Sequence, residues 1–134
     1  MLNGDEHVHL YEETDGAVGH DWQPGVPALV LITKGRKSGS DRKLALIYQE
    51  VDGNPVIVAS NGGAPKHPSW YLNLQADPHV SVQVKADKFT ARARTAVGDE
   101  RAKLWDKMAE VWPHYNEYVK KTDREIPVVV LERV

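Results

Sequence analysis

The sequence has no cysteine, and this absence excludes several classes of site. Without thiols there is no disulfide framework, no thiolate-bound metal and no cysteine nucleophile, which fits a reducing cytosol. The six histidines include no His-x-x-x-His pair, and only His7 and His9 lie close together along the chain. We therefore expect no metal site.

Long apolar runs and a large net charge are also missing. The apolar runs at 28–32 and 128–131 are far too short to span a bilayer, and the polar first 16 residues do not resemble a signal peptide. The formal net charge is −2, whereas a general nucleic-acid binder needs a broad basic surface. We expect a cytoplasmic protein that does not bind nucleic acid.

Two common catalytic signatures are absent as well. There is no Gly-x-Ser-x-Gly motif, and no apolar strand leads into Gly-x-Gly-x-x-Gly. These absences leave a serine hydrolase and a Rossmann nicotinamide enzyme without local support. The function must be sought in segments that could bind a ligand.

The 134 residues, 41% of them hydrophobic, suit one globular domain with a modest core. A core of this size cannot enclose a large ligand, so we expect a ligand to bind in an open groove. Residues 1–26 are polar and rich in glycine. We predict that they form a loosely held arm, with a helical turn or two at 9–14, and that residues 27–134 form the folded domain.

Hydrophobic patterning predicts a mainly β, α+β fold. Apolar runs and period-two alternation predict six strands, at 28–32, 44–48, 55–59, 79–85, 89–97 and 128–131. Helices are predicted at 68–76 and 99–112, the second ended or kinked by Pro113. Asp52-Gly53 predicts a tight turn that pairs the second and third strands. Strands that follow one another as hairpins favour an antiparallel barrel or curved sheet.

The basic loop, residues 33–43, contains five cations and one anion in a chain of negative net charge. Gly35 and Gly39 allow backbone N–H groups to approach an anion, and Ser38 and Ser40 add hydroxyl donors. Arg36, Lys37 and Arg42 could bind phosphate oxygens. The alternative is a solvated hairpin loop that carries protective lysines.

Two further segments combine glycine or proline with aromatic residues. Residues 59–71 connect a strand end to a helix start through Gly62-Gly63, where a flat ligand could bind beside Trp70 and Tyr71. Residues 112–118 place Trp112, Tyr115 and Tyr118 where one helical face could present them together. In both segments the aromatics could instead be ordinary core residues.

Together, residues 35–39 with Arg42, 58–63, 68–74, Pro78-x-Val80 and 112–118 resemble the deazaflavin (coenzyme F420)-dependent nitroreductase family. The resemblance extends from about Tyr11 to Leu131. It implies a split β-barrel of the FMN-binding type, with about six antiparallel strands and two main helices. It also implies an enzyme that passes hydride from reduced F420 to an organic acceptor.

The resemblance also implies roles for individual residues. Those implied to hold the phosphate and acidic tail are Arg36, Lys37, Ser38 and Arg42. Those implied to lie beside the cofactor, its ring or its linker are Lys43, Leu44, Ala45, Leu46, Ile47, Val58, Ala59, Ser60, Asn61, Ser69, Trp70, Tyr71, Leu72 and Asn73. Tyr115 would close over the ring, and Ile47, Trp112 and Tyr118 would line the acceptor pocket. Ser60 and Tyr115 are the candidates for polarising the acceptor.

Three positions depart from the family pattern. This chain has Ala45 where proline is common, Ile47 where an aromatic is frequent and Asn61 where lysine is frequent. Quinones, activated enones and nitro compounds therefore all stay open as acceptors. The alternatives are a non-catalytic F420 carrier and an FMN protein of the same barrel class. We expect a monomer or weak homodimer, with peripheral membrane contact if a longer N-terminus exists.

Overall fold

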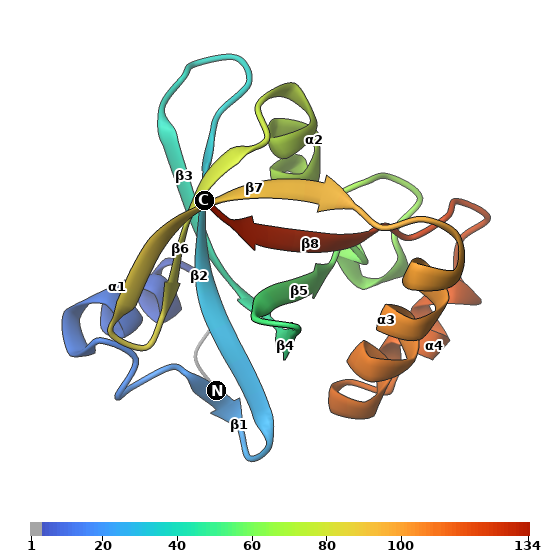
Figure 1. Cartoon of the computed structure of the whole chain (residues 1–134), viewed down its shortest axis with the longest axis horizontal. Coiled ribbons are helices and arrows are strands. Elements are labelled where there is room, and N and C mark those ends of the chain that lie inside the picture. Colours follow the sequence, from blue (N-terminus) through green and yellow to red (C-terminus); the bar gives the residue numbers. More distant parts are fainter. Residues whose placement is uncertain (1–3) are drawn as a thin grey trace.

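The computed structural model describes residues 4–134 and shows a strongly curved sheet with helices at its ends and on its outer face (Figure 1). The strands are β1 (Asp21–Gln23), β2 (Val26–Lys34), β3 (Asp41–Ile47), β4 (Gln49–Val51), β5 (Asn54–Val58), β6 (His79–Val84), β7 (Asp87–Thr95) and β8 (Val128–Arg133). The helices are α1 (Gly4–Thr14), α2 (Ser69–Ala76), α3 (Gly98–Val111) and α4 (His114–Val119), with a 3-10 turn η1 (Asn61–Gly63).

All strand pairs are antiparallel, in the order β1-β2-β6-β7-β8-β5-β4, and β3 also pairs with β2. The predicted mainly β, antiparallel fold is therefore confirmed. Each of the six predicted strands overlaps an observed strand, and the two predicted helices correspond to α2 and α3. The sequence did not predict β1, β4 or α4, because three- to six-residue elements show too few repeats of a pattern, and it predicted only a turn or two of α1.

The predicted pairing of the second and third strands is wrong in its partners. The turn at Asp52-Gly53 joins β4 to β5, and both turn residues have positive φ, 53° and 84°, as a tight primed turn requires. By contrast, β3 pairs with β2 over its whole length, from Ala28↔Ile47 to Lys34↔Asp41. The backbone of β3 is thus hydrogen-bonded to β2, and it is the short β4 that pairs with β5.

The core explains why several strands are apolar without interruption. On β8, Val129 and Leu131 point into the barrel cluster, whereas Val128 and Val130 face a second cluster beneath α3 and α4. Adjacent side chains of a strand point to opposite faces, so a strand covered on both faces is apolar at every position. The prediction that 128–131 is buried near the centre of the sheet is confirmed, because β8 lies between β7 and β5.

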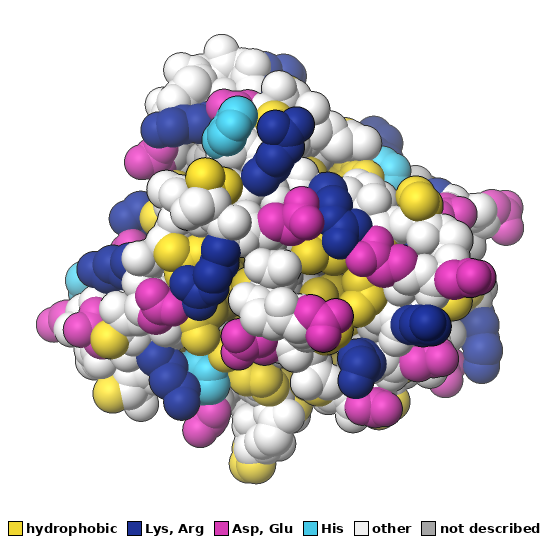
Figure 2. Space-filling model, in the orientation of Figure 1, with side chains coloured by type: hydrophobic (Ala, Val, Ile, Leu, Met, Phe, Trp, Pro, Cys, Tyr) yellow, Lys and Arg dark blue, Asp and Glu magenta, His cyan; other side chains and the backbone are white. Residues whose placement is uncertain are grey.

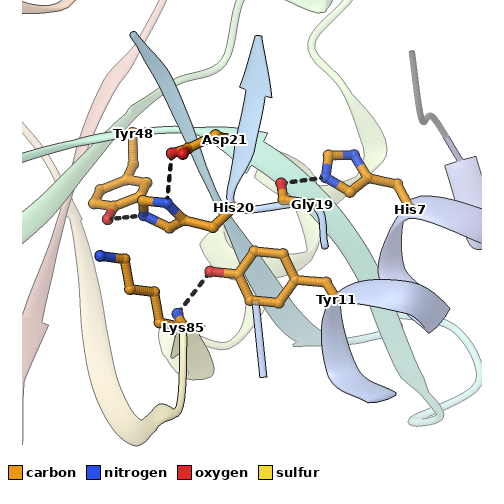
Figure 3. Close-up of polar contacts among 7 residues, drawn as sticks. All are labelled: His7, Tyr11, Gly19, His20, Asp21, Tyr48 and Lys85. Carbon is orange, nitrogen blue, oxygen red and sulfur yellow. Dashed lines mark hydrogen bonds and ion pairs between the residues drawn. The ribbon is translucent and has the colours of Figure 1, made fainter. Parts of the chain in front are cut away.

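The expectation of a loosely held N-terminal arm is wrong for residues 4–23. On α1, Val8 and the fully buried Tyr11 pack against Val30 of β2. The Tyr11 hydroxyl accepts a hydrogen bond from the Lys85 backbone N–H at 2.8 Å (Figure 3). Only three α1 residues are buried, so its apolar stripe is too narrow to stand out among polar neighbours.

A second set of contacts holds β1 against the barrel (Figure 3). The His20 ring lies 2.9 Å from the Asp21 carboxylate through Nδ1 and 2.9 Å from the Tyr48 hydroxyl through Nε2. Burial raises the pKa of Tyr48 to about 12, so its phenol stays protonated beside His20. These contacts fix the position of β1 and of Trp22 within it.

The surface carries charges of both signs. Figure 2 shows Lys and Arg side chains interspersed with Asp and Glu over the face in view, as expected for a net charge of −2. Within residues 4–134, no helix is both long and apolar enough to cross a membrane.

Candidate functional site

A groove of about 760 Å³ lies between the basic loop, the end of β5 and the start of α2. We call it the basic groove. Its walls are formed by Gly35, Arg36, Lys37, Ser38, Arg42, Lys43, Leu44, Leu46, Val58, Ser60, Asn61, Gly62, Pro68, Ser69, Trp70 and Asn73. These residues lie on three separate segments, which the fold brings to one surface.

The basic loop is internally hydrogen-bonded. The Gly35 N–H donates to the Ser40 carbonyl and the Gly39 N–H donates to the Gly35 carbonyl, each at 2.7 Å. The Ser40 N–H donates to Ser38 Oγ at 3.2 Å. The loop therefore has a defined curled shape, unlike an unstructured hairpin connection.

Two of the five loop cations are paired with carboxylates. Lys34 pairs with Asp41, which lowers the pKa of that carboxyl, and Lys43 pairs with Glu12 of α1 at 2.9 Å. Within the described chain, no carboxylate pairs with the other three cations, Arg36, Lys37 and Arg42. All three line the basic groove, which thus presents uncompensated positive charge to a ligand.

Asn73 links the loop to α2. Its Oδ1 accepts hydrogen bonds from the Arg36 backbone N–H at 3.2 Å and from Arg36 Nη1 at 2.8 Å. Its Nδ2 donates to Thr33 Oγ1 at 3.2 Å, and both Asn73 and Thr33 are buried. Asn73 thereby holds the Arg36 guanidinium against the start of α2.

The other end of the groove is apolar. Leu44 and Leu46 project from β3, Val58 ends β5, and Trp70 is buried except at the groove surface. This end suits a flat ring, whereas the loop end suits an anion. The residues therefore fit a cofactor with an anionic tail and an aromatic head.

A second, smaller cavity of about 270 Å³ adjoins the apolar end. We call it the aromatic pocket. Its walls are Gly4, His7, Trp22, Ala28, Ala45, Leu46, Ile47, Val58, Ser60, Gly62, Trp112, Tyr115 and Tyr118. Four residues, Leu46, Val58, Ser60 and Gly62, line both cavities, so the two cavities adjoin and share a wall.

Three aromatics expected on one helical face come from two helices. Trp112 caps α3, and Pro113 separates it from Tyr115 and Tyr118 on α4. They still meet, because the Trp112 Nε1–H donates to the Tyr118 hydroxyl at 3.3 Å. Burial raises the pKa of Tyr115, so its phenol stays protonated.

The structure divides the sequence-predicted residues between the two cavities. Thirteen line the basic groove: Arg36, Lys37, Ser38, Arg42, Lys43, Leu44, Leu46, Val58, Ser60, Asn61, Ser69, Trp70 and Asn73. Ala45, Ile47, Tyr115, Trp112 and Tyr118 line only the aromatic pocket. Side chains of β3 alternate between faces, which separates Ala45 and Ile47 from Leu44.

Three expected contact residues, Ala59, Tyr71 and Leu72, line neither cavity. Ala59 is fully buried behind the groove wall. The Tyr71 hydroxyl lies 2.8 Å from Thr95 Oγ1, so this side chain faces the barrel. The family resemblance implied contacts for whole segments, but strand and helix geometry turn these three residues away from both cavities.

Arg124 is a residue that the sequence did not single out. It donates to the carbonyls of Ser60 at 2.7 Å, Ala64 at 2.9 Å and Ala59 at 3.3 Å. Its Nη1 also lies 3.1 Å from His67 Nδ1, and burial together with the Arg124 charge lowers the pKa of His67. One guanidinium thus supports the loop that borders both cavities. No local sequence motif indicates this role of Arg124.

Residues from the N-terminal segment were also missed. Gly4, His7 and Trp22 contribute to the wall of the aromatic pocket. The rings of Trp22 and Trp112 lie 5.3 Å apart, so this wall joins the two ends of the chain. The sequence did not single these residues out, because they lie in a polar segment that has no periodic apolar pattern.

Gly63 lies in the loop after β5 and determines how closely α4 approaches that loop. Its φ is +82°, and a Cβ there would lie 2.9 Å from the Tyr118 carbonyl oxygen. We expect Gly63→Ala to lower the free energy of unfolding by about 3 kcal/mol, because strain and a backbone clash add. Gly53→Ala is the control, since Gly53 has φ +84° with open space around it, and it should cost about 1 kcal/mol. Urea denaturation of both variants measures the difference, and equal costs would show that the contact with α4 is unimportant.

The curved antiparallel sheet, with the basic groove at its surface, defines a protein of the split β-barrel class. The chain belongs to the F420H(2)-dependent quinone reductase family, whose model matches residues 4–133. The recognised family, the barrel class and the deazaflavin cofactor expected from the sequence are thereby confirmed.

Individual relatives agree with this assignment. An F420H(2)-dependent quinone reductase of Mycobacterium tuberculosis strain H37Rv is 38% identical over 130 residues, covering 95% of this chain and 87% of that protein. A solved structure described as an F420-H2 dependent reductase, FDR-A, is 45% identical with a TM-score of 0.74, covering 79% of this chain and 94% of the other. A structure described as a domain-swapped dimer is 41% identical with a TM-score of 0.77, covering 93% and 92%.

Proposed function

We propose that this F420H2-dependent reductase holds its cofactor in the basic groove and reduces a quinone in the aromatic pocket. The observation that carries the proposal is the wall that the two cavities share, formed by Leu46, Val58, Ser60 and Gly62. A ring bound at the apolar end of the groove would meet an acceptor in the pocket across this shared wall. The names of the relatives, which are quinone reductases, support the choice of acceptor.

The cofactor's anionic tail is assigned to Arg36, Lys37, Ser38 and Arg42. Charge-assisted hydrogen bonds from guanidinium and ammonium groups to phosphate or carboxylate oxygens are about twice as strong as neutral ones. The lack of carboxylate partners for these three cations within residues 4–134 supports the assignment, because their charge is available to a ligand. Asn73 keeps Arg36 oriented before any ligand binds.

When bound, the deazaflavin supplies the hydride, and the protein supplies position and electrostatics. Val58 and Leu46, on the wall between the cavities, exclude water from the reacting centre. Ser60 lines both cavities, and Arg124 fixes its backbone, so its hydroxyl is a hydrogen-bond donor for the acceptor. Tyr115 keeps its phenolic proton and can serve the same purpose from α4.

The acceptor is assigned to Ile47, Trp112 and Tyr118, together with Trp22 from β1. Flat conjugated rings suit a pocket with aromatic walls, since stacked or edge-to-face rings gain about 0.5 to 1.5 kcal/mol beyond their area burial. A quinone has such a ring, with two oxygens that accept hydrogen bonds. An enone or a nitro compound shares only part of this chemistry.

The test is an acceptor series with reduced F420. Mixing the protein with reduced F420 and menadione should restore the visible absorbance of oxidised F420, at a rate proportional to enzyme concentration. Menadione should give a higher kcat/KM than cyclohexenone or a nitroimidazole. A preference for either of the latter would overturn the quinone assignment, and no turnover with any acceptor would overturn the proposed site.

The oligomeric state and the location are further proposals. We expect a monomer or weak homodimer, and the description of one similar structure as a domain-swapped dimer supports the second. Light scattering over a range of protein concentrations distinguishes them. A cytoplasmic location stays a prediction, as does peripheral membrane contact if a longer N-terminus exists.

A further inference from the structure

His7 is a buried polar residue in the wall of the aromatic pocket. It lies on α1, is 4% exposed, and shares the pocket wall with Trp22, Trp112 and Tyr118. Its ring places two hydrogen-bonding nitrogens in a mostly aromatic and aliphatic wall.

One ring nitrogen has a partner within the protein. His7 Nε2 lies 2.8 Å from the Gly19 carbonyl oxygen (Figure 3). A carbonyl oxygen can only accept, so Nε2 carries a hydrogen in every protonation state of the ring. The tautomer is thereby fixed, and Nδ1 is the nitrogen that changes its proton.

The second ring nitrogen, Nδ1, has no hydrogen-bond partner within the described residues 4–134, so these residues leave it available to a ligand. Of the residues that line the pocket, His7 is the one with an imidazole, the side chain that serves most often as a general acid or base. By contrast, the pKa of Tyr115 is raised by burial, and the Tyr118 hydroxyl is engaged by Trp112.

We propose that His7 binds the acceptor's carbonyl oxygen through Nδ1 and delivers the proton that completes its reduction. The proposal rests on the function proposed above. The acceptor takes up the hydrogen and the electron pair of the hydride from reduced F420, which is thereby oxidised, and an anionic oxygen is left on the acceptor. The Nδ1–H bond of the imidazolium then breaks as the new O–H bond forms, and His7 becomes neutral while Nε2 keeps its hydrogen. A proton from solvent restores the imidazolium after the product leaves.

The neutral ring also suits the product. Once Nδ1 has lost its proton, its lone pair accepts a hydrogen bond from the new hydroxyl group. The same nitrogen therefore matches the carbonyl of the substrate and the hydroxyl of the product. Neither the Ser60 hydroxyl nor the Tyr115 phenol can release a proton as readily.

Two variants separate this role from a structural one. In His7→Gln the amide nitrogen replaces Nε2, so the bond to Gly19 is kept and Nδ1 is lost. In His7→Asn the amide nitrogen replaces Nδ1, so the bond to Gly19 is lost instead. His9→Gln on the same helix is the control, because His9 is exposed, pairs with Glu13 and does not line the pocket.

The first measurement is the binding of menadione to the cofactor-free protein. Binding is detected by the quenching of the fluorescence of the tryptophans at the pocket. We expect His7→Gln to raise the Kd about tenfold, the loss of one hydrogen bond. His7→Asn and His9→Gln should stay within about threefold of the wild type. Wild-type affinity in His7→Gln, equal loss in His7→Asn, or no menadione binding by the wild type would overturn the proposal.

The second measurement is steady-state reduction of menadione by reduced F420. Both His7 variants should lose about a hundredfold in kcat, because an amide donates a hydrogen bond without releasing its proton. The Kd for F420 should not change in either. A kcat within about threefold of the wild type in both variants would overturn the proton transfer. Failure of the wild type to reduce any acceptor would instead refute the proposed function, and the binding comparison would still judge the Nδ1 contact.

Discussion

Replacing both Arg36 and Lys37 with alanine should weaken F420 binding by about 2 to 4 kcal/mol, or roughly 30- to 1,000-fold in Kd. Each charged hydrogen bond to a tail oxygen is worth about 1.5 to 3 kcal/mol, and exposure of the loop reduces the sum. Both residues line the basic groove, and neither has a carboxylate partner within residues 4–134. Fluorescence titration with F420 at several salt concentrations measures the loss.

Lys34→Ala is the matched control for this charge removal. Lys34 belongs to the same loop, but it pairs with Asp41 and does not line the groove. Its replacement should cost less than about 1 kcal/mol of binding, as is typical of exposed ion pairs. The wild-type affinity should also fall as salt rises, and this dependence should be smaller in the double variant. Equal affinity of the double variant and the wild type would exclude the basic loop as the tail site.

Arg124→Met should lower the free energy of unfolding by about 3 kcal/mol. The substitution leaves the carbonyls of Ala59, Ser60 and Ala64 without their shared donor, although water can replace part of what is lost. Because this loop borders both cavities, the variant should also weaken F420 binding about tenfold. Urea denaturation and F420 titration test the two effects.

Arg124→Lys separates charge from geometry. A lysine keeps the positive charge but lacks the planar fork that reaches three carbonyls at once. We expect it to recover less than half of the lost stability. Full recovery would show that the charge alone matters and that the hydrogen bonds in the structure are unimportant.

Much of the fold could be predicted from the sequence because it depends on local patterns. The alternation in 79–85 and the apolar runs at 28–32 and 128–131 predict strands without any knowledge of their partners in the fold. The prediction failed where an element depends on a distant partner. The segment 44–47 pairs with β2, whereas β5 pairs with β4. The residues of 44–47 alone do not specify this pairing.

The candidate site shows the same division. Arg36, Lys37 and Arg42 stand within seven residues, so their charge was visible in the sequence. That Lys34 and Lys43 are neutralised, and these three are not, depends on Asp41 and on Glu12, 31 residues before Lys43. The sequence indicated an anion site, and only the structure identifies which cations are available to it.

The basic loop, the strands and the aromatic segments were determined by the sequence itself, because charge, turn geometry and periodicity act between residues close along the chain. The tertiary structure alone decided that His7 and Trp22 would face Trp112 and Tyr115, and that Arg124 would hold the loop after β5. These contacts join residues separated by 60 or more positions. Such contacts form when the sheet curves and buries both faces, and no local pattern contains that information.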